Sequence, residues 1–473
     1  MESLFLLTTI PSLALLCVWL CKSTENLAKL IAVLLWFQVL VVGFVLSPVL
    51  ARRVDSLVIA QDFAVDRLAA FFVLLTQVVV ASAMTHANVF FAQEGAHQTE
   101  RRRNVRVFYT CTILFLLAMT AVFFCQNLGF LWISVEATTL ASARLVYFHR
   151  SKHALEAAWK YLIICSVGIA FALFGTMFIF ASSQYGAIQG GSLNMVELSR
   201  NATALQYPLL RLGFLFCLLG YGTKAGIFPL HSWLPDAHSE APAPASAMLS
   251  GGLLNCALFA IWRIAELVLA SGHLSLVRNA ALSAGVITVV AASLFLIRQH
   301  GIKRLFAYSS IENVGLMLTA IGLGSGPLFF LLALNHSAAK VALFLVSGNI
   351  IQCTGTKELT EIRGLLATSP YWSAILMLGT FAVTGAPPFG AFVAEWQLLA
   401  SGASQHLWQL VAPLVAALAL SFLAVCMHVG KMLSGNPKSG NLPFSPFRST
   451  VVPACLILIT ILTGLTAIPK FFY

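Results

Sequence analysis

The fold is decided by the stretch LLRLGFLFCLLGYGTKAGIFPLHSWLPDAHSEAP, residues 209–242. It begins as an apolar run typical of a membrane-spanning helix, yet Lys224 lies near the end of that run, among glycines and before Pro229. A charge inside a bilayer costs a few kcal/mol or more unless it has a partner, so an intramembrane lysine indicates a functional site. The rest of the sequence has to supply that partner.

The composition is that of a membrane protein. Of the 473 residues, 59% are hydrophobic and 10% charged, and the mean hydropathy is +0.88, whereas soluble domains carry roughly 25% charged residues. Apolar stretches long enough to cross a bilayer core of about 30 Å recur to the end of the chain. We therefore expect one transmembrane domain over residues 1–473, with no soluble domain and no cofactor of its own.

Several function classes are not expected. The net charge of +11 is spread over short loops and forms no soluble basic face, so nucleic acid is not a predicted partner. The ten cysteines include no CxxC pair and favour free buried thiols over a metal or disulfide site. No Ser-His-Asp set, phosphate-binding glycine loop or haem motif is evident, so an independent enzyme is not predicted.

The hydrophobic pattern predicts an all-α polytopic membrane protein with fourteen spans. They lie near residues 4–21, 28–50, 66–92, 105–125, 127–148, 155–183, 207–228, 241–270, 275–299, 306–324, 327–353, 371–400, 408–432 and 450–472. The seventh span, around Lys224, and the twelfth, at Gly385-Ala-Pro-Pro-Phe-Gly390, are predicted to be interrupted. Transporters use such breaks to place binding groups at the midplane, although a simple packing kink is the alternative.

Positive charge concentrates in the odd-numbered loops between these spans. Those loops contain Lys22, Lys29, Arg101, Arg102, Arg103, Arg106, Arg150, Lys152, Arg298, Lys303, Arg304, Lys357, Arg363, Lys431, Lys438 and Arg448. The even-numbered loops contain chiefly Arg52, Arg53, Arg200 and Arg278. By the positive-inside rule the odd loops are cytoplasmic, which predicts both termini on the opposite side of the membrane.

Ionisable residues inside the predicted spans form a short set that alternates in sign. They are Glu136, Lys224, Glu312, His336, Lys340 and Glu395. A neighbouring carboxylate favours the charged form of a lysine while burial opposes it, so such a series can pass protons from one member to the next. His336 and Lys340 are four residues apart and lie on one helix face, where they can hand a proton on.

Some of these residues have structural alternatives that the sequence leaves open. Glu136 can pair with Arg144, two turns on, and anchor its helix. Glu395 can cap the half-helix after Pro388, although it lies two turns in. Glu312 follows a basic loop, and a fold or interface role weighs equally with proton entry.

The segment after Lys224 carries two histidines and two carboxylates within ten residues: His231, Asp236, His238 and Glu240. Their spacing matches no metal template, and prolines stiffen the segment. We expect a proton entry or a structural latch between the seventh and eighth spans rather than a metal site.

At these residues the chain resembles a known family, the antiporter-like membrane subunits of respiratory complex I, group 4 membrane-bound hydrogenases and multisubunit cation/proton antiporters. The resemblance covers nearly the whole chain. Its most specific stretches are residues 224–238, 303–310, 336–345 and 387–395. It implies an antiporter-like inverted repeat and a proton relay in which Glu136, Lys224 and Glu395 match the charged residues of helices five, seven and twelve, with Glu136 as the ion-pair partner of Lys224.

One position departs from the family pattern. Many relatives carry a lysine or histidine in helix eight, where this chain has Asn255. Asparagine binds water but cannot carry a proton as a charge, so the path is expected to pass through water, His336 or Lys340. The helix-ten sequence around Glu312 and the end of the chain at Tyr473 resemble the hydrogenase branch, in particular the hydrogenase-4 component F type.

The resemblance implies a multi-pass subunit of the bacterial inner membrane, with periplasmic termini and the ion path within about residues 105–400. It implies proton movement driven by a peripheral redox arm with iron–sulfur and nickel–iron centres, beside other integral membrane subunits. Two alternatives stay open: a subunit of a multisubunit cation/proton antiporter, and a membrane anchor that no longer pumps, which Asn255 favours.

Overall fold

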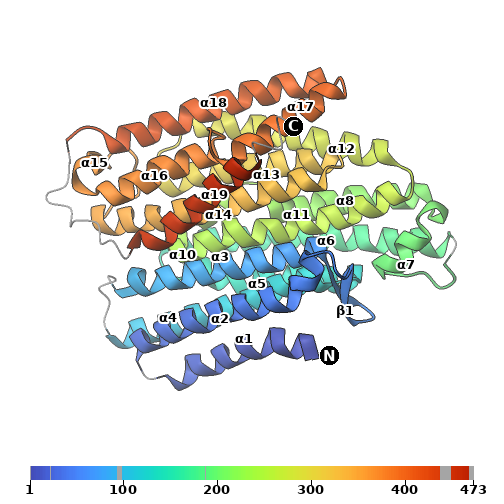
Figure 1. Cartoon of the computed structure of the whole chain (residues 1–473), viewed down its shortest axis with the longest axis horizontal. Helices are drawn as coiled ribbons and strands as arrows, with labels where there is room; N and C mark the ends of the chain where they lie inside the picture. The colour runs from blue at the N-terminus through green and yellow to red at the C-terminus, as the bar shows by residue number, and fades with distance from the viewer. Residues whose placement is uncertain (1, 22, 93–97, 187, 437–448, 468–473) are drawn as a thin grey trace. The chain divides into compact units, whose positions relative to one another are not determined.

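The structure is a computed structural model that describes residues 2–21, 23–92, 98–186, 188–436 and 449–467. It is predominantly helical (Figure 1). The chain divides into two compact units, of which the first comprises Met1–Met84, Gly95–Ala225 and Gly252–Ala280, and the second Thr85–Glu94, Gly226–Gly251 and Ala281–Tyr473. The predicted cations Lys22, Lys438 and Arg448 lie outside the described residues, as does the end of the last predicted span, 468–472.

The first unit is built mainly from long apolar helices. Its elements are α1 (Glu2–Leu20), α2 (Thr24–Leu50), β1 (Ser56–Ala60), β2 (Phe63–Asp66), most of α3 (Arg67–Ala92), α4 (Gln98–Phe124), α5 (Leu128–Val146), α6 (Lys152–Gln184), α7 (Met195–Arg200), η1 (Ala202–Ala204), α8 (Tyr207–Ala225) and α11 (Leu254–Ala270). α6 packs along α8. A Cβ at Gly220 would overlap the backbone of Gly168 and Ala172. Because these residues are small, the two helices lie close together. Their packing fixes the position of Lys224, which lies one turn beyond Gly220 on α8.

The second unit is arranged around a buried helix, α14 (Gly326–Thr354). The other elements are the end of α3, α9 (Trp233–Glu240), α10 (Ala243–Met248), the π-helical turn η2 (Leu249–Leu253, shared with the first unit), most of α12 (Leu274–Leu296), α13 (Ile302–Gly322), α15 (Leu365–Thr368), α16 (Pro370–Val383), α17 (Gly390–Ser404), α18 (Trp408–Leu433) and α19 (Val451–Ala467). α13, α16, α17 and α19 all pack against α14 (Figure 1).

Helix lengths agree with a protein that crosses a membrane many times. Among the described residues, eight helices are long and apolar enough to span a bilayer, and three shorter apolar helices accompany them. α8 ends at Ala225 and the next helix begins at Trp233, while α16 ends at Val383 and α17 begins at Gly390. Gly226 and Gly385, the first glycines after α8 and α16, have φ of 83° and 66°, a left-handed conformation that glycine adopts without strain.

Two elements were not expected from the sequence. The loop after the second predicted span folds into an antiparallel hairpin, β1 and β2, whose few β-branched residues are too short a run to read as a span. The segment treated as a loop around His231 contains helix α9, in which Pro235 lies in the first turn. A backbone N–H is not needed there, so the proline is compatible with the helix.

Candidate functional site

Lys224 is fully buried near the end of α8 in the first unit. Its Nζ donates hydrogen bonds to the Thr139 Oγ1 on α5, at 2.6 Å, and to the Tyr161 hydroxyl on α6, at 2.9 Å. Nζ also lies 4.9 Å from the centre of the Tyr161 ring. Two helices, α5 and α6, therefore provide the polar and aromatic partners that a buried ammonium group requires.

Glu136 is connected to this lysine through the Thr139 hydroxyl. Thr139 Oγ1 donates to Glu136 Oε2 at 3.1 Å, and Ser166 Oγ on α6 donates to the other carboxylate oxygen at 2.9 Å. Lys224 and Glu136 attract each other electrostatically, but among the described ion pairs none joins them directly. The resemblance implied a direct ion pair; the structure places one hydroxyl group between the two charges.

The donor directions in this cluster follow from counting hydrogens. Tyr161 accepts from Lys224, so its single hydroxyl proton is directed to Ser142 Oγ, 2.6 Å away. Ser142 in turn donates to the Thr138 carbonyl at 2.6 Å. Every hydroxyl in this chain of bonds has a defined direction, so the ammonium group is held in one position.

The structure does not pair Arg144 with Glu136. Arg144 Nη1 donates to the Tyr147 carbonyl at 2.9 Å, and its guanidinium lies 5.2 Å from the centre of the Tyr147 ring. Both carboxylate oxygens of Glu136 instead accept from hydroxyl groups, those of Thr139 and Ser166.

Asn255, the residue that departs from the family pattern, is fully buried on α11, and α11 packs against α8.

Lys340 lies fully buried on α14 in the second unit, with a different set of neighbours. Its Nζ donates to the Phe306 carbonyl at 3.1 Å. One turn earlier, His336 Nε2 lies 3.3 Å from the Ser250 carbonyl in η2, and Ser337 donates to the Gly251 carbonyl. A π-helical turn leaves carbonyl groups available to such side chains, and these turns occur often at functional sites.

Two buried carboxylates accompany Lys340. Glu312 on α13 attracts Lys340 electrostatically and repels Glu395 on α17. The buried Ser421 hydroxyl on α18 lies beside the Glu312 carboxylate, and within the described residues Glu312 Oε1 has no other hydrogen-bond partner. The Glu395 carboxylate packs against Gly385, where a Cβ would overlap it. The break between α16 and α17 therefore leaves room for the Glu395 side chain.

The polar residues of α9 have two kinds of surroundings: Asp236 and Glu240 form ion pairs, which we call the latch, and His238 is buried. Asp236 pairs with Arg304 at 2.5 Å and Glu240 with Lys357 at 2.8 Å, which ties α9 to α13 and to the segment after α14. His238 is fully buried and its ring stacks on Phe344, with centroids 4.7 Å apart. Neither His238 nitrogen has a hydrogen-bond partner in the part of the chain that the structure describes.

His231 has mainly aromatic neighbours. Its ring lies 5.5 Å from Phe228, 5.5 Å from Phe295 and 6.0 Å from Tyr308, measured between ring centroids. Over the described ranges, no group of three or more His, Cys, Asp or Glu side chains has the geometry of a metal site.

Sequence reasoning missed several buried titratable residues, among them His86 and Arg263. His86 lies in the part of α3 that belongs to the second unit, and its Nε2 is 3.0 Å from Asn349 Oδ1 on α14. A histidine in an apolar helix is the signal that identifies it, because ionisable residues within spans are rare. Thr139, Tyr161 and Ser166 were also missed, and single hydroxyls in membrane helices give no comparable signal.

Comparisons with known proteins identify the family. Residues 125–421 match the family described as NADH:quinone oxidoreductase/Mrp antiporter, transmembrane. The hydrogenase-4 component F homolog of Methylacidiphilum infernorum is 35% identical over 395 residues, which cover 83% of this chain and 82% of the homolog.

Two solved structures have the same fold. A chain of an archaeal respiratory complex, the membrane-bound sulfane sulfur reductase, superposes with a TM-score of 0.86 at 22% identity, covering 99% of this chain and 95% of that one. A chain of respiratory complex I from Thermus thermophilus gives 0.77 at 20% identity, covering 98% and 97%. With its apolar helices and buried charges, this chain is an integral multi-pass membrane protein that belongs to the NADH:quinone oxidoreductase/Mrp antiporter family of membrane subunits.

Proposed function

We propose that this chain is the proton-translocating membrane subunit of a complex I-like or membrane-bound hydrogenase complex. The observation that carries the proposal is the connection from the buried Lys224 through the Thr139 hydroxyl to Glu136. A proton can pass between a cation and a carboxylate through the one hydroxyl group that links them, so the two side chains need not come into direct contact. The family membership and the hydrogenase-type relative support the same role.

The proton step follows from the hydrogen-bond directions. As Lys224 gives a proton to Thr139 Oγ1, the proton already on that oxygen passes to Glu136 Oε2. The products are a neutral lysine and a protonated glutamate, and total charge is conserved. Thr139 then has to rotate its O–H back before another proton can pass, so the step depends on the hydroxyl being free to turn.

We assign Lys340, His336 and Glu395 to proton transfer within the second unit, with Glu312 and His238 as supporting groups. Their unpartnered polar atoms need water to connect them, since buried polar groups are stable only when hydrogen-bonded. Asn255 is assigned to holding water beside the path. Asp236, with its ion pair, and His231, with its aromatic neighbours, are assigned to positioning α9.

The proposed architecture has fourteen spans in one membrane domain. The interruptions around Lys224 in the seventh span and at Gly385–Gly390 in the twelfth are part of this proposal, supported by the helix ends at Ala225 and Val383. The orientation proposed from the loop charges places both termini on the periplasmic side of a bacterial inner membrane. Iron–sulfur or nickel–iron centres are proposed for peripheral partner subunits, beside further integral membrane subunits.

Replacing Lys224 with Met tests the proposal. Inverted membrane vesicles are energised with the electron donor of the complex, and proton uptake per electron is measured with a pH-sensitive dye. We expect the Lys224→Met variant to lose redox-driven proton uptake, because the side chain keeps its apolar length and loses its exchangeable proton. Lys431→Met, at the exposed end of α18, is the matched control and should behave as the unmodified protein.

The outcomes separate the competing functions. Unchanged proton uptake in Lys224→Met, with the complex assembled, would show that the chain serves as an anchor and not as a pump. Proton uptake that requires an imposed sodium gradient and no electron donor would identify a cation/proton antiporter subunit, a function that the family description also contains.

A further inference from the structure

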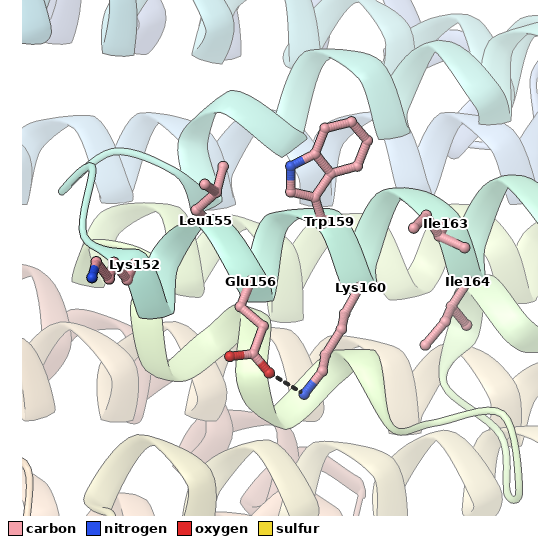
Figure 2. A pocket seen from close by; sticks show the side chains of 7 residues that line it. All are labelled: Lys152, Leu155, Glu156, Trp159, Lys160, Ile163 and Ile164. Carbon is pink, nitrogen blue, oxygen red and sulfur yellow. Dashed lines mark ion pairs between the residues drawn. The ribbon is translucent and has the colours of Figure 1, made fainter.

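The outer face of α5 and α6 has two adjoining hollows that the relay does not use. One, of about 480 Å³, is lined by residues of α6, including Trp159 and Ile163 (Figure 2). The other, of about 320 Å³, lies between α5 and α6 and includes Leu140 and Leu162. Leu155 and Trp159 line both hollows, so they form the ridge between them.

The hollows are apolar and open to the outside. Trp159 is 56% exposed and Leu140 65% exposed. Figure 2 shows Leu155 and Trp159 on one side of α6, and the ion pair between Glu156 and Lys160, 2.9 Å long, on the neighbouring side. In a membrane protein, an exposed apolar face of this kind contacts either lipid tails or another membrane helix.

Uncompensated positive charge surrounds one end of this face. The Arg144 guanidinium lines the second hollow and is close enough to Arg103 and Arg150 for the three charges to repel one another. Lys152 lines the first hollow. Among the ion pairs found in the described ranges, none involves any of these four cations.

We propose that this face binds one anionic glycerophospholipid, with its two acyl chains in the hollows on either side of Trp159 and its phosphate between Arg144 and Arg150. Guanidinium groups bind phosphate oxygens in a bidentate manner, and basic pockets at the cytoplasmic ends of membrane helices bind anionic headgroups. A free phosphate ion would leave both apolar hollows empty. A zwitterionic lipid would add a cation to a site that already has an excess of them.

The site is independent of the proposed proton relay. No atom of Lys224, Thr139 or Glu136 lines either hollow. Loss of lipid binding and loss of proton movement can therefore be measured separately, and failure of one proposal leaves the other standing.

Quenching of Trp159 fluorescence by brominated lipid provides the test. The assembled complex is purified in detergent, depleted of lipid, and titrated with brominated phosphatidylglycerol or brominated phosphatidylcholine. The Trp159 signal is the difference between the unmodified complex and a Trp159→Phe complex. We expect half-maximal quenching at about a tenfold lower fraction of phosphatidylglycerol than of phosphatidylcholine, because only the anionic headgroup has a net attraction to Arg144 and Arg150.

Charge variants identify the headgroup contacts. The double variant Arg144→Gln with Arg150→Gln should bind both lipids alike, whereas Arg144→Lys with Arg150→Lys should keep most of the preference. Arg298→Gln, an exposed cation elsewhere in the chain, is the matched control and should keep all of it. If the glutamine double variant does not assemble, high salt should abolish the preference in the unmodified complex, since ion pairing is screened.

Two results would overturn the proposal. Equal quenching by the two lipids would show an ordinary lipid-facing surface without a headgroup site. Absence of any Trp159 quenching would show that another membrane subunit covers this face.

Discussion

The two fully buried lysines, Lys224 in the first unit and Lys340 in the second, are stabilised in different ways. Lys224 donates to two side-chain hydroxyls, and one of these leads directly to a carboxylate. Lys340 donates to a backbone carbonyl. Near it, Glu312 Oε1 and His336 Nδ1 have no hydrogen-bond partner in the described structure.

This difference separates two kinds of proton conductor. A continuous series of side-chain hydrogen bonds, as around Lys224, can pass a proton by rotation of hydroxyl groups alone. A cluster with unpartnered polar atoms, as around Lys340, needs water molecules to complete it. We expect the first cluster to be sensitive to single hydroxyl deletions and the second to changes in charge or in the space for water.

After the loss expected for Lys224→Met, the largest effect is expected from replacing Lys340 with Met. Glu312 would lose the cation that attracts it, while Glu395 would still repel it, so neither carboxylate would have a cationic neighbour with which to exchange a proton. Redox-driven proton uptake in vesicles should fall to less than about a tenth of the normal rate, a barrier increase of at least ~1.4 kcal/mol.

Lys431→Met is again the control for this measurement. If Lys340→Met keeps full proton uptake while Lys224→Met loses it, the residues around Lys340 do not conduct protons. The residues around Lys224 would then form the whole path.

A change at the α16–α17 break should come next in size. In Gly385→Ala, the new methyl group would overlap the Glu395 carboxylate and occupy a left-handed conformation, which costs roughly 1–2 kcal/mol by itself. We expect a melting temperature several degrees lower for the purified complex, together with reduced proton uptake.

Gly430→Ala is the matched control, because nothing lies within 4 Å of a Cβ there. An alanine in that helix should be neutral or slightly stabilising. Equal stability of the two variants would show that Glu395 moves away from Gly385 at no cost, which would weaken the assignment of the break as its site.

Deleting one hydroxyl tests the side-chain conductor. Thr139→Val keeps the shape of the residue and removes the oxygen that joins Lys224 to Glu136. The variant loses both hydrogen bonds that this oxygen makes to charged groups, and a net barrier increase of ~1.5 kcal/mol corresponds to about a tenfold slower proton uptake. Measured in the same vesicles, this effect should be smaller than that of Lys340→Met.

Thr138→Val is the control in the same helix. Thr138 is equally buried, but its hydroxyl donates only to the Val135 carbonyl of its own helix. Similar slowing in both variants would mean that the threonines stabilise α5 and do not conduct.

Sequence reasoning identified the charged members of both clusters but not their connections. Lys224 and Lys340 stand out because charges are rare in apolar runs, and Glu136 and Glu395 follow by the same logic. Tyr161 and Thr139 do not stand out in the sequence, since hydroxyl groups are tolerated throughout membrane helices. Their role depends on which face of α5 and α6 meets α8.

The missed elements have similar physical causes. The segment of α9 was treated as a loop stiffened by prolines, although Pro235 lies in a first turn, where a helix tolerates proline. The hairpin of β1 and β2 is too short for hydropathy to separate it from a loop. His86 was missed although its position in a span is visible in the sequence, and its partner Asn349 comes from a helix that only the fold brings near.

The smallest effect is expected at the latch between α9 and α13. The ion pair between Asp236 and Arg304 is partly exposed, with Arg304 42% accessible, and exposed ion pairs contribute about 0–1 kcal/mol. Arg304→Ala should lower the thermal stability of the complex slightly, and the decrease should shrink in 1 M salt because salt screens the charges. A double-mutant cycle with Asp236→Asn isolates the pair from the packing of the arginine stem. A large coupling energy that persists in high salt would instead show that the pair is shielded from solvent in the assembled complex, because screening acts on exposed charges far more than on buried ones.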